Sequence, residues 1–100
     1  MLKKDLIELC LLYLLSVEDL YGYELLRRIH EAFPDTRESA VYALIRNLSK
    51  EGYTIQYEGK TSDGPIRKYY HITDAGAEKM NCLLCEWVRL RDALFALGVR

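Results

Sequence analysis

Residues 52–73 restrict the fold most strongly, because two runs of alternating apolar and polar residues are separated there by a short polar segment. The apolar positions of the two runs are Tyr53, Ile55 and Tyr57, then Ile66, Tyr70 and Ile72. Alternation with a period of two is typical of β-strands, and the glycine and proline that close residues 60–65 are typical of a turn. The stretch therefore predicts a β-hairpin with a polar, basic tip. We expect Ile66, Tyr70 and Ile72 to pack on the domain.

Residues 35–51, which precede the hairpin, have helical periodicity. Val41, Leu44, Ile45 and Leu48 follow one another at i, i+3, i+4 and i+7, so they form the buried face. The opposite face consists of Ser39, Ala43, Arg46 and Lys50, with Tyr42 and Asn47 beside it. Arginine and asparagine pair with base edges in the major groove, whereas lysine and tyrosine hold phosphates. This face is typical of a DNA-recognition helix, although an ordinary solvated helix surface has a similar composition.

A helix of this kind followed by a basic hairpin predicts a winged helix that binds double-stranded DNA. On the hairpin, alternation places Arg67, Tyr69 and His71 on the face that can lie along phosphates, and Lys68 reaches solvent near the tip. The full set of DNA-contact candidates is Ser39, Tyr42, Arg46, Asn47, Lys50, Lys60, Arg67, Lys68 and Tyr69. We expect the helix residues to select the site and the hairpin residues to clamp phosphates regardless of sequence.

Two helices are expected before residue 35. Residues 3–16 are apolar around most of the helix circumference, so this helix needs cover on more than one side. After a polar turn at residues 16–19, a second helix opens at Tyr21 and ends at Pro34, because the residue that precedes a proline avoids the helical region. In so small a domain, part of the cover for the first helix is expected from a second subunit.

The last helix is expected to begin at an N-cap formed by Thr73 or Asp74 and to end at Gly98. Its heptad seam consists of Met80, Leu83, Trp87, Leu90, Leu94 and Leu97, and a second apolar line consists of Leu84, Val88 and Phe95. One line can pack on the first helix of its own subunit and the other on a partner, which predicts a homodimer. The interface candidates are Leu6, Leu9, Met80, Leu83, Leu90, Leu94 and Leu97.

Length limits the chain to one small domain, because 100 residues, 50% of them apolar, form a single thin core. The expected fold class is mainly α with a small β-hairpin. We expect a winged helix-turn-helix DNA-binding domain over residues 1–73 and a C-terminal dimerisation helix over residues 74–100 that packs on the first helix.

The net charge of −1 argues against a general polyanion-binding protein. Residues 36–73, however, carry six Lys or Arg against four Asp or Glu, so a positive excess lies on the third helix and the hairpin. An excess of two charges is also compatible with a solvated surface of mixed charge.

The three cysteines, Cys10, Cys82 and Cys85, lack the spacing of a disulfide framework and fit a reducing, cytoplasmic setting. The apolar run at residues 9–15 is far shorter than the roughly 20 residues needed to span a bilayer, so no membrane partner is expected. Cys82 and Cys85 have no second ligand pair, so we expect no metal site and assign them to buried packing. A thiol-based redox-sensing regulator remains an alternative.

No catalytic constellation is recognisable, because His30 and His71 have no Ser, Cys or acid at a motif spacing. We therefore expect no enzyme activity and no cofactor. The main alternative to a DNA-binding protein is a winged-helix protein-interaction module without specific DNA binding. Basic residues on both the third helix and the hairpin favour DNA, since an interaction module has no need for them in both places.

Four further segments carry specific sequence. They are Tyr-Gly-Tyr-Glu-Leu at residues 21–25, Glu-Ser-Ala-Val-Tyr at 38–42, Leu-Ser-Lys-Glu-Gly-Tyr at 48–53 and Gly-Pro-Ile-Arg-Lys-Tyr-Tyr-His-Ile-Thr-Asp-Ala-Gly at 64–76. In this order and spacing they resemble the PadR family of winged-helix transcriptional regulators, in its short form with one C-terminal dimerisation helix. The resemblance implies a homodimer that binds an inverted-repeat operator, usually in its own promoter region. It also implies repression that an aromatic or cationic small molecule relieves. Ala40 and Ala43 depart from the Thr and Pro that the family commonly has at these positions.

Trp87 is the effector contact that the resemblance implies. In multidrug-binding members of this family, a tryptophan at the corresponding place lines a pore at the dimer centre, where flat ligands stack between two such residues. Tyr13 and Phe95 are further candidates for the lining of this pocket. The alternative is that Trp87 only fills the dimer interface.

Overall fold

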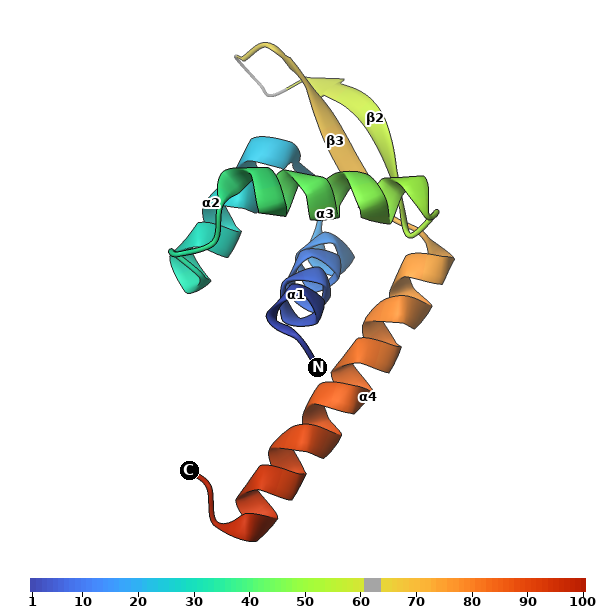
Figure 1. Ribbon diagram of the computed structural model, residues 1–100. Coiled ribbons are helices and arrows are strands. Elements are labelled where there is room, and N and C mark those ends of the chain that lie inside the picture. The colour runs from blue at the N-terminus through green and yellow to red at the C-terminus, as the bar shows by residue number, and fades with distance from the viewer. Residues whose placement is uncertain (61–63) are drawn as a thin grey trace.

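The computed structural model describes residues 1–60 and 64–100, and within these ranges it has four helices and one three-stranded antiparallel sheet (Figure 1). The elements are α1 (Lys3–Val17), β1 (Leu20–Tyr21), α2 (Gly22–Ala32), α3 (Glu38–Lys50), β2 (Thr54–Lys60), β3 (Ile66–Ile72) and α4 (Asp74–Leu97). The expected class, mainly helical with a small hairpin, is confirmed. The predicted hairpin tip includes residues 61–63, which lie outside the described residues.

The core lies where α1, α2 and α3 meet beneath the sheet. The buried side chains of α1 are Ile7, Leu11, Leu12 and Leu15, and those of α2 are Leu25, Leu26 and Ile29. The α3 face predicted from periodicity is confirmed, because Val41, Leu44, Ile45 and Leu48 are all buried. Burying this face leaves the opposite side of α3 for a function outside the core.

The sheet has the strand order β1–β3–β2, and β3 pairs with both neighbours. Its covered face holds Thr54, which is 2% exposed, and its cross-strand partner Ile72, which is half-buried. The prediction that Ile66 packs on the domain is wrong, because this side chain is 65% exposed. Ile66 pairs with Lys60 at the far end of the ladder, where the hairpin projects beyond the helices (Figure 1).

Two boundaries differ from the sequence prediction. The second helix begins at Gly22, because Leu20 and Tyr21 form the short strand β1 that pairs with Tyr70 and Tyr69 of β3. A strand of two residues has no detectable alternation, which is why it was not predicted. The third helix begins at Glu38, three residues later than expected, because residues 35–37 complete the turn that follows Pro34.

The helix α4 leaves the sheet at a short, well-bonded joint and then runs away from the rest of the chain (Figure 1). Thr73, one of the two predicted candidates, is its N-cap, and the Thr73 hydroxyl accepts a hydrogen bond from the Gly76 N–H at 3.0 Å. The first half of α4 packs on α1 through Leu83, whereas Leu94 and Leu97 in the second half are exposed. No helix within residues 1–60 and 64–100 is long and apolar enough to cross a membrane.

Candidate nucleic-acid interface

The polar face of α3 is accessible along its whole length. The side chains of Ser39, Arg46, Asn47 and Lys50 are exposed. They include a guanidinium, an amide and an ammonium group, which are donors suited to base edges and phosphates. The structure therefore brings four of the five predicted helix contacts to one exposed surface.

Tyr42, the fifth helix candidate, is less exposed than the other four, because its ring lies over the start of α2 and is half-buried there. A Cβ atom added at Gly22 would lie 3.4 Å from the Tyr42 ring and 3.9 Å from the Tyr70 ring. Burial raises the pKa of the Tyr70 hydroxyl, while the positive charge of Arg46 acts in the opposite direction. Arg46 is thus near enough to Tyr70 for its charge to act on that hydroxyl.

The four hairpin candidates divide into two groups. Lys60 and Lys68 are exposed near the far end of the hairpin, within reach of a bound polyanion. The Arg67 guanidinium instead lies 4.8 Å from the centre of the Tyr21 ring. Tyr69 stacks on Tyr57, with 5.8 Å between ring centres.

The outer face of the sheet is consequently a cluster of three tyrosines and one arginine. Tyr21 contacts Tyr69 edge to face, with 5.6 Å between the ring centres, and Tyr57 covers the other side of Tyr69. Gly59 makes room for this cluster, because a Cβ at that position would lie 2.6 Å from the Tyr69 ring. Arg67 contacts this cluster through the Tyr21 ring.

A polar group beside this cluster was not predicted from the sequence. The Asp19 carboxylate, from the turn after α1, accepts a hydrogen bond from the Tyr57 hydroxyl and lies 2.8 Å from Nδ1 of His71. Burial acts to raise the pKa of Asp19, but the hydrogen bonds from Tyr57 and His71 lower it below its ordinary value. The residues are 38 and 52 positions apart, so no spacing motif connects them.

Similarity to known proteins identifies the class of protein that carries this surface. The sequence model of the PadR-like transcriptional regulator family matches residues 11–81. The chain belongs to this family. It is therefore a DNA-binding transcriptional regulator, and regulators of this family are generally not enzymes.

Solved structures of similar sequence have the same fold, and one curated protein is also similar. A PadR-like transcriptional regulator of Bacillus cereus is 35% identical, covers 90% of this chain and 88% of its own, and superposes with a TM-score of 0.83. A protein of Streptococcus mutans is 32% identical, with coverages of 98% and 93% and a TM-score of 0.86. An uncharacterised protein of Lysinibacillus sphaericus is 32% identical over 84% of this chain and 80% of its own length.

Three of the seven predicted dimer-contact residues of this PadR-like chain, Leu90, Leu94 and Leu97, are exposed on α4. The large apolar side chains exposed there are Leu84, Trp87, Leu90, Leu94, Phe95 and Leu97. Leu6, Leu9 and Met80 are half-buried where α1 and α4 meet. Leu83 is the exception, because it is 6% exposed and packs in the core of its own chain. Its contact with a second copy stays a prediction, and the side chain already packs against its own chain.

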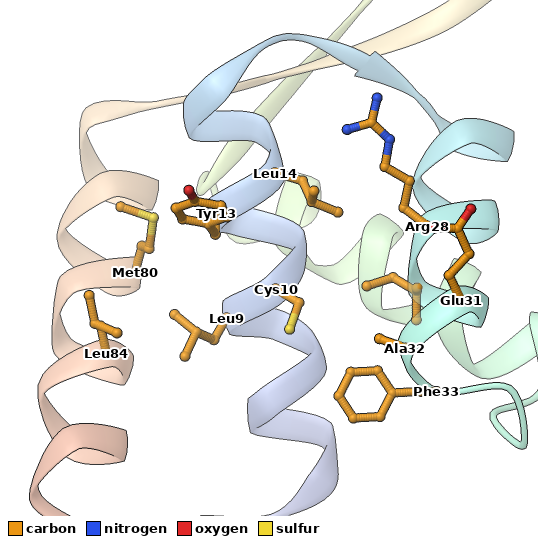
Figure 2. Close-up of a pocket in the computed structure, with 11 residues that line it drawn as sticks. Leu9, Cys10, Tyr13, Leu14, Arg28, Glu31, Ala32, Phe33, Met80 and Leu84 are labelled. Carbon is orange, nitrogen blue, oxygen red and sulfur yellow. The ribbon is translucent and has the colours of Figure 1, made fainter.

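The three predicted effector contacts do not meet in one place within the chain. Figure 2 shows Tyr13 in a hollow of about 460 Å³ between α1, α2 and α4, where it is directed toward Met80. Trp87 lines a different hollow of about 230 Å³, together with Leu6 and Leu94. Phe95 lines neither of these two hollows.

Trp87 already has a cationic neighbour. The Arg91 guanidinium lies 5.2 Å from the centre of the Trp87 ring, and it also pairs with Asp92 at 3.1 Å. A cation over an indole is attracted by the electron-rich ring face. Arg91 thus contacts one face of the Trp87 ring in the way that a cationic ligand would.

The predicted burial of Cys82 and Cys85 is wrong, because both side chains are exposed on α4. They lie beside Asn81, Glu86 and Arg89 on the surface of α4. Within the described residues, no group of three or more His, Cys, Asp or Glu side chains is arranged to hold a metal ion.

Proposed function

We propose that this PadR-like chain is a homodimeric transcriptional repressor that binds an inverted-repeat operator and releases it when a small effector binds at the dimer interface. The observation that carries the proposal is the exposed polar face of α3 beside a hairpin with exposed lysines. Each alone is an ordinary protein surface. Together they supply a base-reading element and a phosphate-contacting element in the order required by a winged helix.

The contacts are assigned by chemistry and position. Arg46 and Asn47 read base edges in the major groove, because arginine pairs with guanine and asparagine with adenine. Lys60 and Lys68 contact phosphates along the hairpin, where their charge acts without regard to sequence. Ser39, Lys50 and Tyr42 complete the helix surface. Arg67 and Tyr69 support the hairpin through the tyrosine cluster and contact DNA only through their outer edges.

A second copy of the chain is proposed to cover the exposed part of α4. Leu94 is 50% exposed, Phe95 52% and Leu97 83%, so the apolar face of the second half of this helix is largely exposed to solvent. Exposed apolar surface that is contiguous on one helix is typical of an interface. A twofold dimer presents two copies of α3 in opposite orientations, which is why the operator is proposed to be an inverted repeat.

The effector is proposed to be a flat aromatic or cationic compound that stacks on Trp87. In the chain, Arg91 occupies one face of the indole at 5.2 Å. A ligand that binds there replaces or sandwiches the guanidinium and so changes the contacts between the two copies of α4. Because α4 joins the hairpin directly at Thr73, altered pairing changes the distance between the two DNA-contacting surfaces.

The repressor proposal is tested by footprinting the purified protein on the DNA upstream of its own reading frame. Arg46→Ala is expected to weaken binding to the protected site by about 1–3 kcal/mol. Lys68→Ala is expected to weaken binding to all duplexes nearly equally and to flatten the salt dependence. Arg89→Ala, on the exposed side of α4, is the charge-matched control. If neither Arg46→Ala nor Lys68→Ala changes DNA affinity at low salt, the repressor proposal is refuted.

The effector proposal is tested through the intrinsic fluorescence of Trp87, the only tryptophan in the sequence. Planar aromatic dyes are expected to quench it in the dimer and to lower the affinity for DNA. Trp87→Ala is expected to abolish dye binding while leaving DNA binding intact. Unchanged dye affinity in this variant would show that stacking on Trp87 is not the basis of recognition.

A thiol-based redox-sensing regulator is the second candidate function, and the exposure of Cys82 and Cys85 is the observation that supports it. Oxidation of an exposed thiol adds a polar or bulky group to α4. The test is DNA binding before and after treatment with peroxide, compared with a Cys82→Ser/Cys85→Ser variant. An equal response of the two proteins would exclude a role for this pair.

A further inference from the structure

A hollow of about 430 Å³ lies between the amino end of α1 and one side of α3, outside the predicted DNA contacts of the hairpin. Its wall on α3 includes the small side chains of Ala40 and Ala43 beside Leu44 and Asn47. The residues that line it and bear on its chemistry are Lys3, Lys4, Thr36, Ala40, Ala43 and Asn47. Figure 1 shows the amino end of α1 below the middle of α3. The hollow is thus bordered by two ammonium groups and by the recognition helix.

The positive charge of Lys3 beside the hollow is only weakly paired. Lys3 and Lys4 are both exposed. The Lys3 ammonium lies 3.2 Å from the Asp35 carboxylate, and these side chains are 49% and 80% exposed. Exposed ion pairs of this kind are weak and screened by water and salt. An incoming anion can therefore take the place of Asp35 beside Lys3.

Two further features favour an anion at the same place. Within the described chain, the N-cap Arg37 gives no side-chain hydrogen bond to the start of α3, so the first N–H groups of this helix remain available. The amino end of a helix attracts negative charge. Thr36, on the turn just before α3, lines the hollow, and its Oγ1 is buried without a hydrogen-bond partner among the described residues.

The hollow is continuous with the DNA-reading face. Asn47 belongs to both, because its side chain is exposed on α3 and also lines the hollow. A helix in the major groove is bordered by a phosphate backbone on each side. On one side of α3, Tyr42 lies over α2. On the other side, the first groups that a backbone would meet are Lys3 and Lys4.

We propose that this hollow is a phosphate-contact site in which Lys3 and Lys4 hold the DNA backbone that borders α3 on the side of α1. Asp35 is the displaceable partner of Lys3, and it exchanges with a backbone phosphate when DNA binds. The site adds sequence-neutral affinity and fixes how deeply α3 enters the groove. This inference rests on the proposed DNA contacts of α3 and assigns the other edge of the same interface.

The test measures binding of the full chain to a fluorescein-labelled 30-base-pair duplex of mixed sequence, by anisotropy at several KCl concentrations. Each phosphate contact contributes about 0.9 to the slope of log affinity against log salt. Lys3→Ala/Lys4→Ala is therefore expected to reduce this slope by about 1.8 and to weaken binding on the order of tenfold near 100 mM salt. Arg89→Ala removes one charge far from α3 and is expected to change the slope by less than about 0.5. Equal losses per charge in the two variants would refute a local contact.

Asp35→Asn separates a phosphate site from a purely structural ion pair. If Lys3 holds DNA, removing the competing carboxylate leaves Lys3 available, and binding is expected to tighten about threefold. If the pair only fastens α1 to the turn before α3, the variant binds no more tightly, which would overturn the proposal. Arg46→Ala is measured in parallel on a duplex that carries the footprinted site, because Arg46 is proposed to read base edges. A loss with Arg46→Ala and none with Lys3→Ala/Lys4→Ala refutes this inference alone, whereas no loss with either refutes the proposed DNA surface as a whole.

Discussion

Replacing Gly76 by alanine tests the joint between the sheet and α4. A Cβ at this position would lie 2.0 Å from the carbonyl oxygen of Tyr53 and 2.8 Å from a side-chain carbon of Ile72. Contacts of a Cβ below 3.0 Å are essentially never seen. The nearest obstacle is a backbone atom, which cannot rotate away as a side chain does. The start of α4 must therefore move by about 1 Å relative to β2.

The expected loss of stability follows from the hydrogen bonds that this movement breaks. The Thr73 N–H donates to the carbonyl of Tyr53 at 3.1 Å, and the Thr73 hydroxyl donates to the carbonyl of Gly52 at 2.7 Å. Overpacking costs about 1–3 kcal/mol, and each hydrogen bond contributes about 1 kcal/mol net. We expect Gly76→Ala to lower the free energy of unfolding by about 3 kcal/mol. That is a large fraction of the roughly 5–15 kcal/mol typical of a domain.

The assay is urea denaturation followed by far-ultraviolet circular dichroism, together with a thermal melt. A loss of about 3 kcal/mol corresponds to a fall in Tm of about 12–24 °C for a domain of this size. Gly52→Ala is the control, because Gly52 has a positive φ of 85° but no atom within 4 Å of an added Cβ. It reports backbone strain alone, about 1–2 kcal/mol. If Gly76→Ala destabilises the chain no more than Gly52→Ala does, the close packing of this joint is not what fixes α4.

Three further predictions concern the cap, the proposed interface and pH. Thr73→Ala removes the N-cap of α4 and is expected to cost about 1 kcal/mol in urea denaturation, whereas Thr73→Ser is expected to retain most of the stability. Leu94→Glu is expected to convert the proposed dimer to monomer in sedimentation velocity with little change in the far-ultraviolet spectrum, because Leu94 is 50% exposed in the chain; a dimer that persists would contradict the interface. Hydrogen bonding from Arg27 lowers the pKa of Glu24 from 4.5 to about 2, so its stabilising effect is present above pH 4.5 and is lost as the pH falls toward 2. Glu24→Gln is therefore expected to cost about 1 kcal/mol at pH 7 and nothing near pH 2; an equal cost at both would show that charge is not the cause.

The parts of the fold that were predictable are those whose signal is repeated along the sequence. The buried face of α3 recurs at i, i+3, i+4 and i+7, and each of its four residues is buried. The start of α4 was predictable because Thr73 has the chemistry of an N-cap, and its hydroxyl does accept the Gly76 N–H. The alternation of β3 correctly predicted which residues share a face. It did not predict how far along the hairpin that face is covered, and so Ile66 was placed wrongly.

The features that were not predictable depend on contacts between distant residues. Asp19 reaches His71, which is 52 positions away, and no local pattern marks either residue as a partner. The burial of Leu83 inside its own chain depends on which side of α4 meets α1, and two apolar lines on α4 are equally good candidates by periodicity. Cys82 is exposed for the same reason, because it is not among the α4 residues that pack on the core. Helical period identifies faces, but only tertiary packing decides which of them is covered.

The joint at Thr73 explains why the hairpin and α4 act as one unit in the proposed repressor. A single residue, Thr73, separates β3 from α4, and its backbone and side chain make four hydrogen bonds, two to the turn after α3 and two to the first turn of α4. Such a connection cannot rotate without breaking bonds, so the direction of α4 fixes the position of the hairpin. In the proposed dimer, a ligand that favours one pairing of the two α4 helices therefore favours one spacing of the two hairpins. A ligand with equal affinity for both pairings would leave DNA binding unchanged, however tightly it bound.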